Sequence, residues 1–153
     1  MRSNLGFTLI ELMVVVTLVA LATAGVTLAL RDDGSTKLER EALRLSALIE
    51  SARAQSRTSG LPVVWRSRPQ GFEFAGLPPL RGGATSQINL SGPRLWLSTD
   101  TVAEVTLPPG ALSLVLGPEP LIAAQRLVLR QGDRRLTLAT DGLSPFAVVL
   151  ETP

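Results

Sequence analysis

The sequence predicts an α+β protein, in which a long hydrophobic helix at the amino terminus precedes a small antiparallel β-domain. Three observations support this class. Residues 7–30 contain one charge in twenty-four positions. Residues 37–59 repeat apolar side chains at spacings of three and four, which is the period of a helix. Beyond Gly60 come short apolar or alternating segments separated by proline and glycine, as is typical of strands.

The length and composition of the chain limit the classes of function that it can have. The chain has 153 residues, enough for one domain of ordinary size and an anchor. Its net charge of +2 is too small to indicate nucleic-acid binding. The chain has no cysteine and no histidine, which excludes thiolate metal sites, disulfides, cysteine nucleophiles and Ser-His-Asp triads. We therefore expect no enzyme, no catalytic residue, no metal and no cofactor.

The apolar segment 7–30 is long enough to cross a membrane. As a helix it would be about 36 Å long, against a hydrocarbon core of about 30 Å. A secretory signal peptide is one alternative, because Arg2 precedes the apolar residues and small residues lie near their end. The segment is longer than the core of such peptides. A buried core helix is the other alternative, but a chain of this size cannot wrap so long an apolar helix. We therefore predict a membrane helix.

Glu11 is the one charged residue of this segment. A carboxylate near the middle of a membrane helix costs about 2.5 to 3.5 kcal/mol on insertion scales, so a compensating positive group is expected. The amino group of Phe7 could supply it, in the same helix or from a neighbouring subunit, if Phe7 became a new chain start. Cleavage after Gly6 would create that amine.

The residues GFTLIE, at positions 6–11, resemble the type III signal of type IV pilins and type II secretion pseudopilins. The resemblance implies that a prepilin peptidase cuts after Gly6 and methylates the new amino terminus at Phe7. It also implies that Glu11 is the assembly charge of the membrane helix.

The residues RDDGST after Leu30 predict the exit from the membrane and a kink or break in the helix near Gly34. Ser35 or Thr36 could cap a second helix in a capping box with Glu39. An EF-hand-like calcium loop is a poorer interpretation of the two aspartates, because the alternating oxygen ligands are missing. A second, amphipathic helix is expected to end at Gly60 and Pro62. Its apolar stripe consists of Leu38, Ala42, Leu45, Leu48, Ile49 and Ala52.

Nine short segments after Gly60 are predicted strands, arranged as an antiparallel sandwich or a pair of small sheets. Residues 126–131 and 134–140 are expected to form a hairpin around Gly132 and Asp133. The prolines are expected in connections, and 77–91 is expected to be a mobile loop. The segments are LPVVWR, FEFAG, QINL, RLWLS, AEVTL, LSLVL, RLVLR, RLTLAT and FAVVLE.

These patterns divide the chain into four parts. Residues 1–6 are the predicted leader and 7–30 the transmembrane and assembly helix. Residues 31–60 are the amphipathic helix that packs on the soluble domain, and 61–153 are the β-rich periplasmic domain.

Three further segments resemble the minor pseudopilins of the GspH kind from type II secretion systems: the helix and strand of 39–66, GFEF at 71–74 and DGLSPFAVVL at 141–150. The resemblance implies a subunit at or near the tip of the pseudopilus that helps export folded proteins across the outer membrane. It implies a single-pass protein of a Gram-negative inner membrane, with its carboxyl-terminal domain in the periplasm. Implied partners are other minor pseudopilins, the major pseudopilin, the prepilin peptidase, membrane lipid and secreted substrates.

A minor pilin of the FimT kind, which assembles pili or takes up DNA, is the alternative family member. DNA-binding members carry basic residues near the carboxyl end, whereas this chain ends in SPFAVVLETP. Arg130, Arg134 and Arg135 form the nearby basic cluster, and we interpret them as a solvated strand surface. Trp65 and Trp96 are interpreted as core residues rather than stacking platforms. Nucleic acid is therefore not an expected partner.

Overall fold

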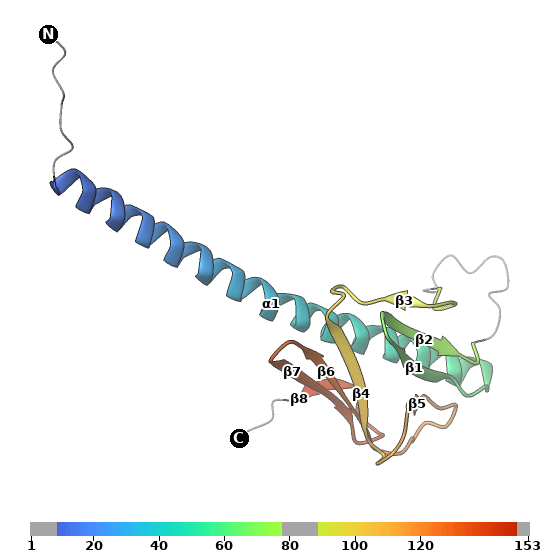
Figure 1. The fold of residues 1–153 in the computed structure, drawn as a ribbon. Coiled ribbons are helices and arrows are strands. Elements are labelled where there is room, and N and C mark those ends of the chain that lie inside the picture. The colour runs from blue at the N-terminus through green and yellow to red at the C-terminus, as the bar shows by residue number, and fades with distance from the viewer. Residues whose placement is uncertain (1–8, 78–88, 150–153) are drawn as a thin grey trace, which may run out of the picture. The chain divides into compact units, whose positions relative to one another are not determined.

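We analysed a computed structural model, which describes residues 9–77 and 89–149; within this range the side chains of 26–35 are not described. The chain divides into two compact units, Met1–Ser35 and Thr36–Pro153. One helix, α1, and eight strands make up the described residues (Figure 1). Their bounds are α1 Leu9–Ser59, β1 Val64–Arg68, β2 Gly71–Ala75, β3 Arg94–Leu95, β4 Thr101–Leu107, β5 Ser113–Val115, β6 Gln125–Gln131, β7 Arg134–Thr140 and β8 Ala147–Val149.

Helix α1 is continuous from Leu9 to Ser59, so the predicted break near Gly34 is wrong. Neither Ser35 nor Thr36 begins a second helix. A glycine inside a helix costs only about 1 kcal/mol relative to alanine, and helical residues on both sides favour propagation through it. The helix-breaking effect of the residues around Gly34 was therefore weaker than the cooperativity of helix formation.

The carboxyl-terminal part of α1 buries the stripe that the spacing predicts. All six of its apolar residues are buried, and Ala42, Leu45, Ile49 and Ala52 are completely inaccessible to solvent. The helix ends at Ser59, as predicted, because Gly60 adopts a φ of 71° and donates its N–H to the carbonyl oxygen of Ser56 at 2.9 Å.

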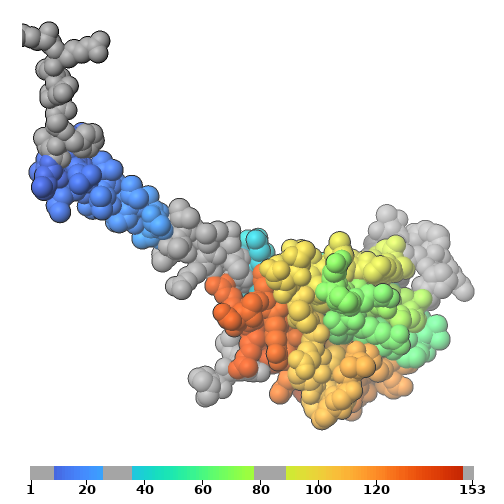
Figure 2. All heavy atoms as spheres, viewed as in Figure 1, coloured from blue at the N-terminus to red at the C-terminus, as the bar shows by residue number. Residues whose placement is uncertain are grey.

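The strands form two antiparallel sheets of four strands each, in the orders β3-β2-β1-β5 and β4-β6-β7-β8. The prediction of an α+β fold with two small sheets is confirmed, and face-to-face sandwich packing stays a prediction. Figure 2 shows the described residues of the second unit as one continuous body. Side chains from α1 and from both sheets share one hydrophobic core.

The β6–β7 hairpin is confirmed. Its register pairs Gln131 with Arg134 and leaves Gly132 and Asp133 as the two loop residues. Gly132 has a φ of 57°, as the first loop position of a type II′ turn requires. Leu127, Leu129 and Leu138 on this hairpin are buried, so the alternation seen in the sequence marks the core side of the sheet.

Two predicted strands differ from the structure. Of QINL, residues 87–88 lie outside the described residues, and Asn89 and Leu90 are not in a strand. Of RLWLS, only Arg94 and Leu95 pair with β2. The region 78–88, which holds most of the predicted mobile loop, also lies outside the described residues. Pro108, Pro109, Pro118 and Pro120 lie in connections, as predicted.

An aromatic cluster fills the core beneath the first sheet. Trp65 and Phe72 are fully buried, and Trp96 is 6% exposed, so both tryptophans are core residues as predicted. The Phe72 ring lies 4.8 Å from Trp96 and packs edge-on against Phe74 at 5.8 Å between centroids. Such pairs contribute about 0.5 to 1.5 kcal/mol beyond the area they bury.

Polar side chains of α1 hold the segment that leads into β8. Arg53 is only 3% exposed, although it does not belong to the apolar stripe of the helix. Its guanidinium donates to the carbonyl oxygens of Gly142 at 3.0 Å and Ser144 at 3.2 Å. Glu50 accepts the N–H of Phe146 at 3.0 Å. The DGLSPF segment is therefore fixed to the helix through its backbone.

Candidate functional site

The amino-terminal part of α1 presents apolar side chains to its surroundings. From Leu9 to Leu21 every large apolar side chain is exposed, for example Leu9 at 77% and Met13 at 65%. A contiguous exposed apolar surface of this kind marks a contact with a membrane or with another protein. In a helix that is apolar on every side, such contacts can form all around its axis.

The hydroxyl groups of Thr17 and Thr23 on α1 do not need a hydrogen-bond partner outside the helix. Thr17 Oγ1 donates to the carbonyl oxygen of Met13 at 2.8 Å, and Thr23 Oγ1 donates to that of Val19 at 2.6 Å. Their hydroxyl groups are therefore satisfied within the helix, which lowers the cost of placing them in an apolar environment.

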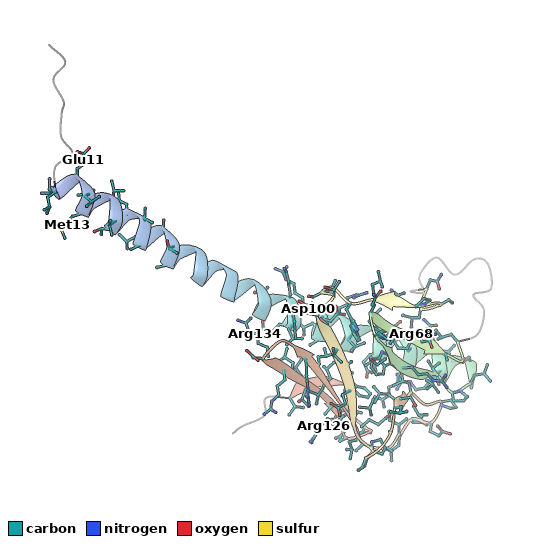
Figure 3. The ribbon with its side chains drawn as sticks, viewed as in Figure 1. Glu11, Met13, Arg68, Asp100, Arg126 and Arg134 are labelled. Carbon is teal, nitrogen blue, oxygen red and sulfur yellow. The ribbon has the colours of Figure 1, made fainter. Side chains whose placement is uncertain are left out.

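Glu11 lies in the first turn of α1 and is exposed, at the amino-terminal end of the helix (Figure 3). Gly6 and Phe7, the predicted cleavage and methylation residues, lie outside the described residues.

Within the described range, no helix combines the length and the hydropathy needed to cross a membrane. The predicted span of 7–30 reaches beyond that range, since Phe7 and Thr8 and the side chains of 26–30 are not described. The membrane span therefore stays a prediction.

The predicted basic cluster lies on β6 and β7. Arg130 stands opposite Arg135 in the register, and Gln131 stands opposite Arg134. Arg130 also forms an ion pair with Glu104 on β4 at 3.4 Å, with both side chains more than half exposed. An exposed pair of this kind contributes about 0 to 1 kcal/mol.

The carboxylates that the sequence leaves unassigned are dispersed. Glu41 is 1% exposed; it accepts the N–H of Leu97 at 2.5 Å and pairs with Arg44 at 3.0 Å. Asp141 accepts the N–H groups of Ser144 and Leu143, and these bonds lower its pKa from the ordinary value. In the part of the chain that the structure describes, no three acidic residues are grouped as metal ligands would be.

Among the cavities on the second unit are two that no sequence motif indicated. One has a volume of about 390 Å³ beside β5. The other, of about 330 Å³, lies where the β1–β2 turn meets β3, and we call it the arginine pocket. Arg68 and Arg94, which line it, are separated by twenty-six positions, so only the pairing of β2 with β3 brings them together. The arginine pocket is lined by Arg68, Pro69, Gln70, Gly71, Phe72, Pro93, Arg94 and Leu95.

Comparison with known proteins identifies the amino terminus. Residues 1–27 match the prokaryotic N-terminal methylation motif. This match includes Gly6, Phe7 and Glu11, and it gives the chain the amino-terminal segment of a type IV pilin-like protein. No curated protein and no solved structure matches the chain.

Proposed function

We propose that this chain is a minor pseudopilin of a type II secretion system, a non-enzymatic subunit at or near the tip of the pseudopilus that helps export folded proteins. The observation that carries the proposal is the methylation motif over residues 1–27, which includes the exposed apolar residues of α1 from Leu9 to Leu21 and precedes a compact β-rich unit. The resemblance of 39–66 and 141–150 to minor pseudopilins of the GspH kind supports the finer assignment.

In the proposed mechanism, the leader keeps the amine of Phe7 masked as a peptide bond. A prepilin peptidase cuts after Gly6 and methylates the new terminus, which exposes a positive charge four residues from Glu11. That charge compensates the carboxylate within the inner membrane, on the same or a neighbouring subunit. Cleavage would then permit assembly through the apolar surface of α1.

Mass spectrometry of the mature protein tests the processing step. We expect the chain purified from its native membrane to begin at N-methylated Phe7. A chain that keeps residues 1–6, or that begins elsewhere, would contradict the processing step.

The role of Glu11 is tested by Glu11→Ala and Glu11→Lys in the full chain. Both variants should reduce incorporation into the filament or tip complex, measured by crosslinking and co-purification, while the second unit stays folded. Glu39→Ala is the matched control, because it removes an exposed acid elsewhere on the same helix. Normal secretion by the Glu11 variants would count against the assigned role.

The orientation can be tested directly because the chain contains no cysteine. Thr106 is exposed on β4, so Thr106→Cys should react with a membrane-impermeant maleimide in cells whose outer membrane has been permeabilised. Labelling only after the inner membrane is disrupted would contradict a periplasmic domain.

One observation favours a second candidate, a DNA-binding minor pilin of the FimT kind. The register of β6 and β7 places Arg126, Arg130 and Arg135 on one face of the second sheet. A salt-dependent mobility shift of DNA by residues 31–153, lost on replacing Arg134 and Arg135 with alanine, would support this function. Absence of binding at low salt would remove it.

A further inference from the structure

The arginine pocket is shaped by a close approach of two backbones. A Cβ atom added to Gly71 would lie 1.9 Å from the carbonyl oxygen of Arg94, so only glycine allows β2 and β3 to come this close. The N–H of Trp96 donates to the carbonyl oxygen of Gln70 at 3.1 Å and fixes β3 to the β1–β2 turn. The pocket is therefore built into the pairing of the first sheet.

Phe72 of the aromatic cluster is one of the residues around the pocket, and it is fully buried. Phe72 lines the pocket, and its ring is held on the inner side by Trp96 and Phe74. Leu95 lines the same pocket and is 71% exposed, so an apolar group that enters can cover it. Covering such a leucine removes apolar surface from water, which favours binding.

Both charged residues that line the pocket are arginines. Arg68 forms an ion pair with Glu73 at 2.6 Å, which offsets part of its charge. Arg94 donates through Nη2 to the carbonyl oxygen of Asn89, and its Nε is buried with no hydrogen-bond partner among the described residues. Because this Nε is inaccessible, an anionic ligand would have to contact the rest of the Arg94 guanidinium.

The pocket thus combines an apolar surface with a positive rim whose main unsatisfied group is Arg94. Arg44 adds positive charge from the helix side, since its guanidinium lies 5.7 Å from the centroid of Phe72 and donates to the carbonyl oxygen of Leu95 at 3.2 Å. Among the described residues no acid lines the pocket, although Arg68 pairs with Glu73 and Arg44 pairs with Glu41. A carboxylate next to an apolar side chain complements both features, because arginine binds carboxylates with charge-assisted hydrogen bonds.

We propose that the arginine pocket binds a peptide segment of a partner protein, in which an apolar side chain stands next to a carboxylate. The apolar side chain covers Leu95, and the carboxylate accepts hydrogen bonds from Arg94 and, more weakly, from Arg68. The volume of about 330 Å³ suits one or two side chains rather than a nucleic-acid strand. This inference is independent of the proposed secretion role.

The test is isothermal titration calorimetry with the full chain in detergent micelles. The probe is the peptide acetyl-SGLEGS-amide, with acetyl-SGLQGS-amide and acetyl-SGAEGS-amide as matched probes that lack the carboxylate or the large apolar side chain. We expect the first peptide to bind at least tenfold more tightly than either of the others. Equal binding of all three peptides, no binding of the first, or equal binding of acetate alone would overturn the proposal.

Variants of the pocket assign the contacts. Arg94→Gln should weaken binding of acetyl-SGLEGS-amide about tenfold and Arg68→Gln about threefold, because Arg68 is already paired with Glu73. Arg126→Gln, an exposed arginine on the second sheet (Figure 3), is the control and should bind like the unmodified chain. Unchanged binding by Arg94→Gln would refute the assignment.

A second variant keeps the test decisive if Arg94→Gln does not fold. Leu95→Asp replaces an exposed side chain, so folding should be retained, and it places a negative charge beside the expected carboxylate. It should abolish binding of acetyl-SGLEGS-amide, with thermal unfolding as the check on folding. A folded Leu95→Asp chain that binds this peptide normally would also refute the proposal.

Discussion

Replacing Arg53 with methionine removes a buried guanidinium from the contact between α1 and the DGLSPF segment, while the aliphatic stem is largely retained. Two hydrogen bonds of ordinary length, to Gly142 and Ser144, are lost. Contacts with Pro120 and Glu50 at 3.5 Å are weak and add little. At about 1.5 to 3 kcal/mol for each bond to a charged group, the gross loss is about 3 to 6 kcal/mol.

Two terms reduce this loss. Arg53 Nε is buried without a hydrogen-bond partner among the described residues, so the substitution also removes an unsatisfied donor. The substitution also removes the cost of burying a charge. We therefore expect Arg53→Met to lower the free energy of unfolding by about 2 to 3 kcal/mol, a large fraction of the 5 to 15 kcal/mol that is usual for a domain.

Urea unfolding of residues 36–153, followed by the fluorescence of the buried Trp65 and Trp96, measures this change. Arg57→Met is the matched control, because Arg57 is exposed one turn later on α1 and should change stability by less than about 0.5 kcal/mol. If Arg53→Met lowers the free energy of unfolding as little as the control does, the reasoning that this guanidinium fixes the DGLSPF segment is refuted.

Three other predictions concern the same unit. Gly142→Ala should destabilise it by more than about 2 kcal/mol, because Gly142 has a φ of 97° and a Cβ would meet a backbone oxygen at 1.9 Å. Gly132→Ala, with a φ of 57° and open space, is its control in the same urea assay and should cost about 1 kcal/mol. Since the pKa of Asp141 is lowered from 3.8 on folding, its contribution to stability is present above pH 3.8 and is lost as the pH falls through the folded-state pKa. Asp141→Asn should therefore show a smaller drop in urea midpoint between pH 5 and pH 3 than the unmodified unit; an equal drop would contradict this. Gln125→Met removes two side-chain hydrogen bonds to β5 and should cost about 1 to 2 kcal/mol; an unchanged urea midpoint would count against it.

The apolar stripe of α1 and the β6–β7 hairpin could be predicted because both depend on local periodicity. Leu45 and Ile49 recur at the helical spacing, and Leu127 and Leu129 alternate as a strand requires. The break near Gly34 was predicted from local signals, but helix continuity depends on residues on both sides of the glycine.

The assignment of the strands to the two sheets could not be predicted in the same way. β5 pairs with β1 across nearly fifty positions, and β4 lies in the other sheet although it precedes β5 directly in the chain. Pairing over such distances depends on which faces share the core, and no local pattern records it. The position of Gln125 follows from that pairing. Its side-chain amide forms hydrogen bonds with the N–H and the carbonyl oxygen of Val115.

The sequence by itself determined the methylation motif that includes Gly6, Phe7 and Glu11, because a short motif is a local property. The tertiary structure decided which arginines are buried and which of them line the same pocket. Arg53 is buried because it donates to carbonyl oxygens about ninety positions away in the chain. Arg68 and Arg94 form one pocket only because β2 pairs with β3 through the close approach at Gly71.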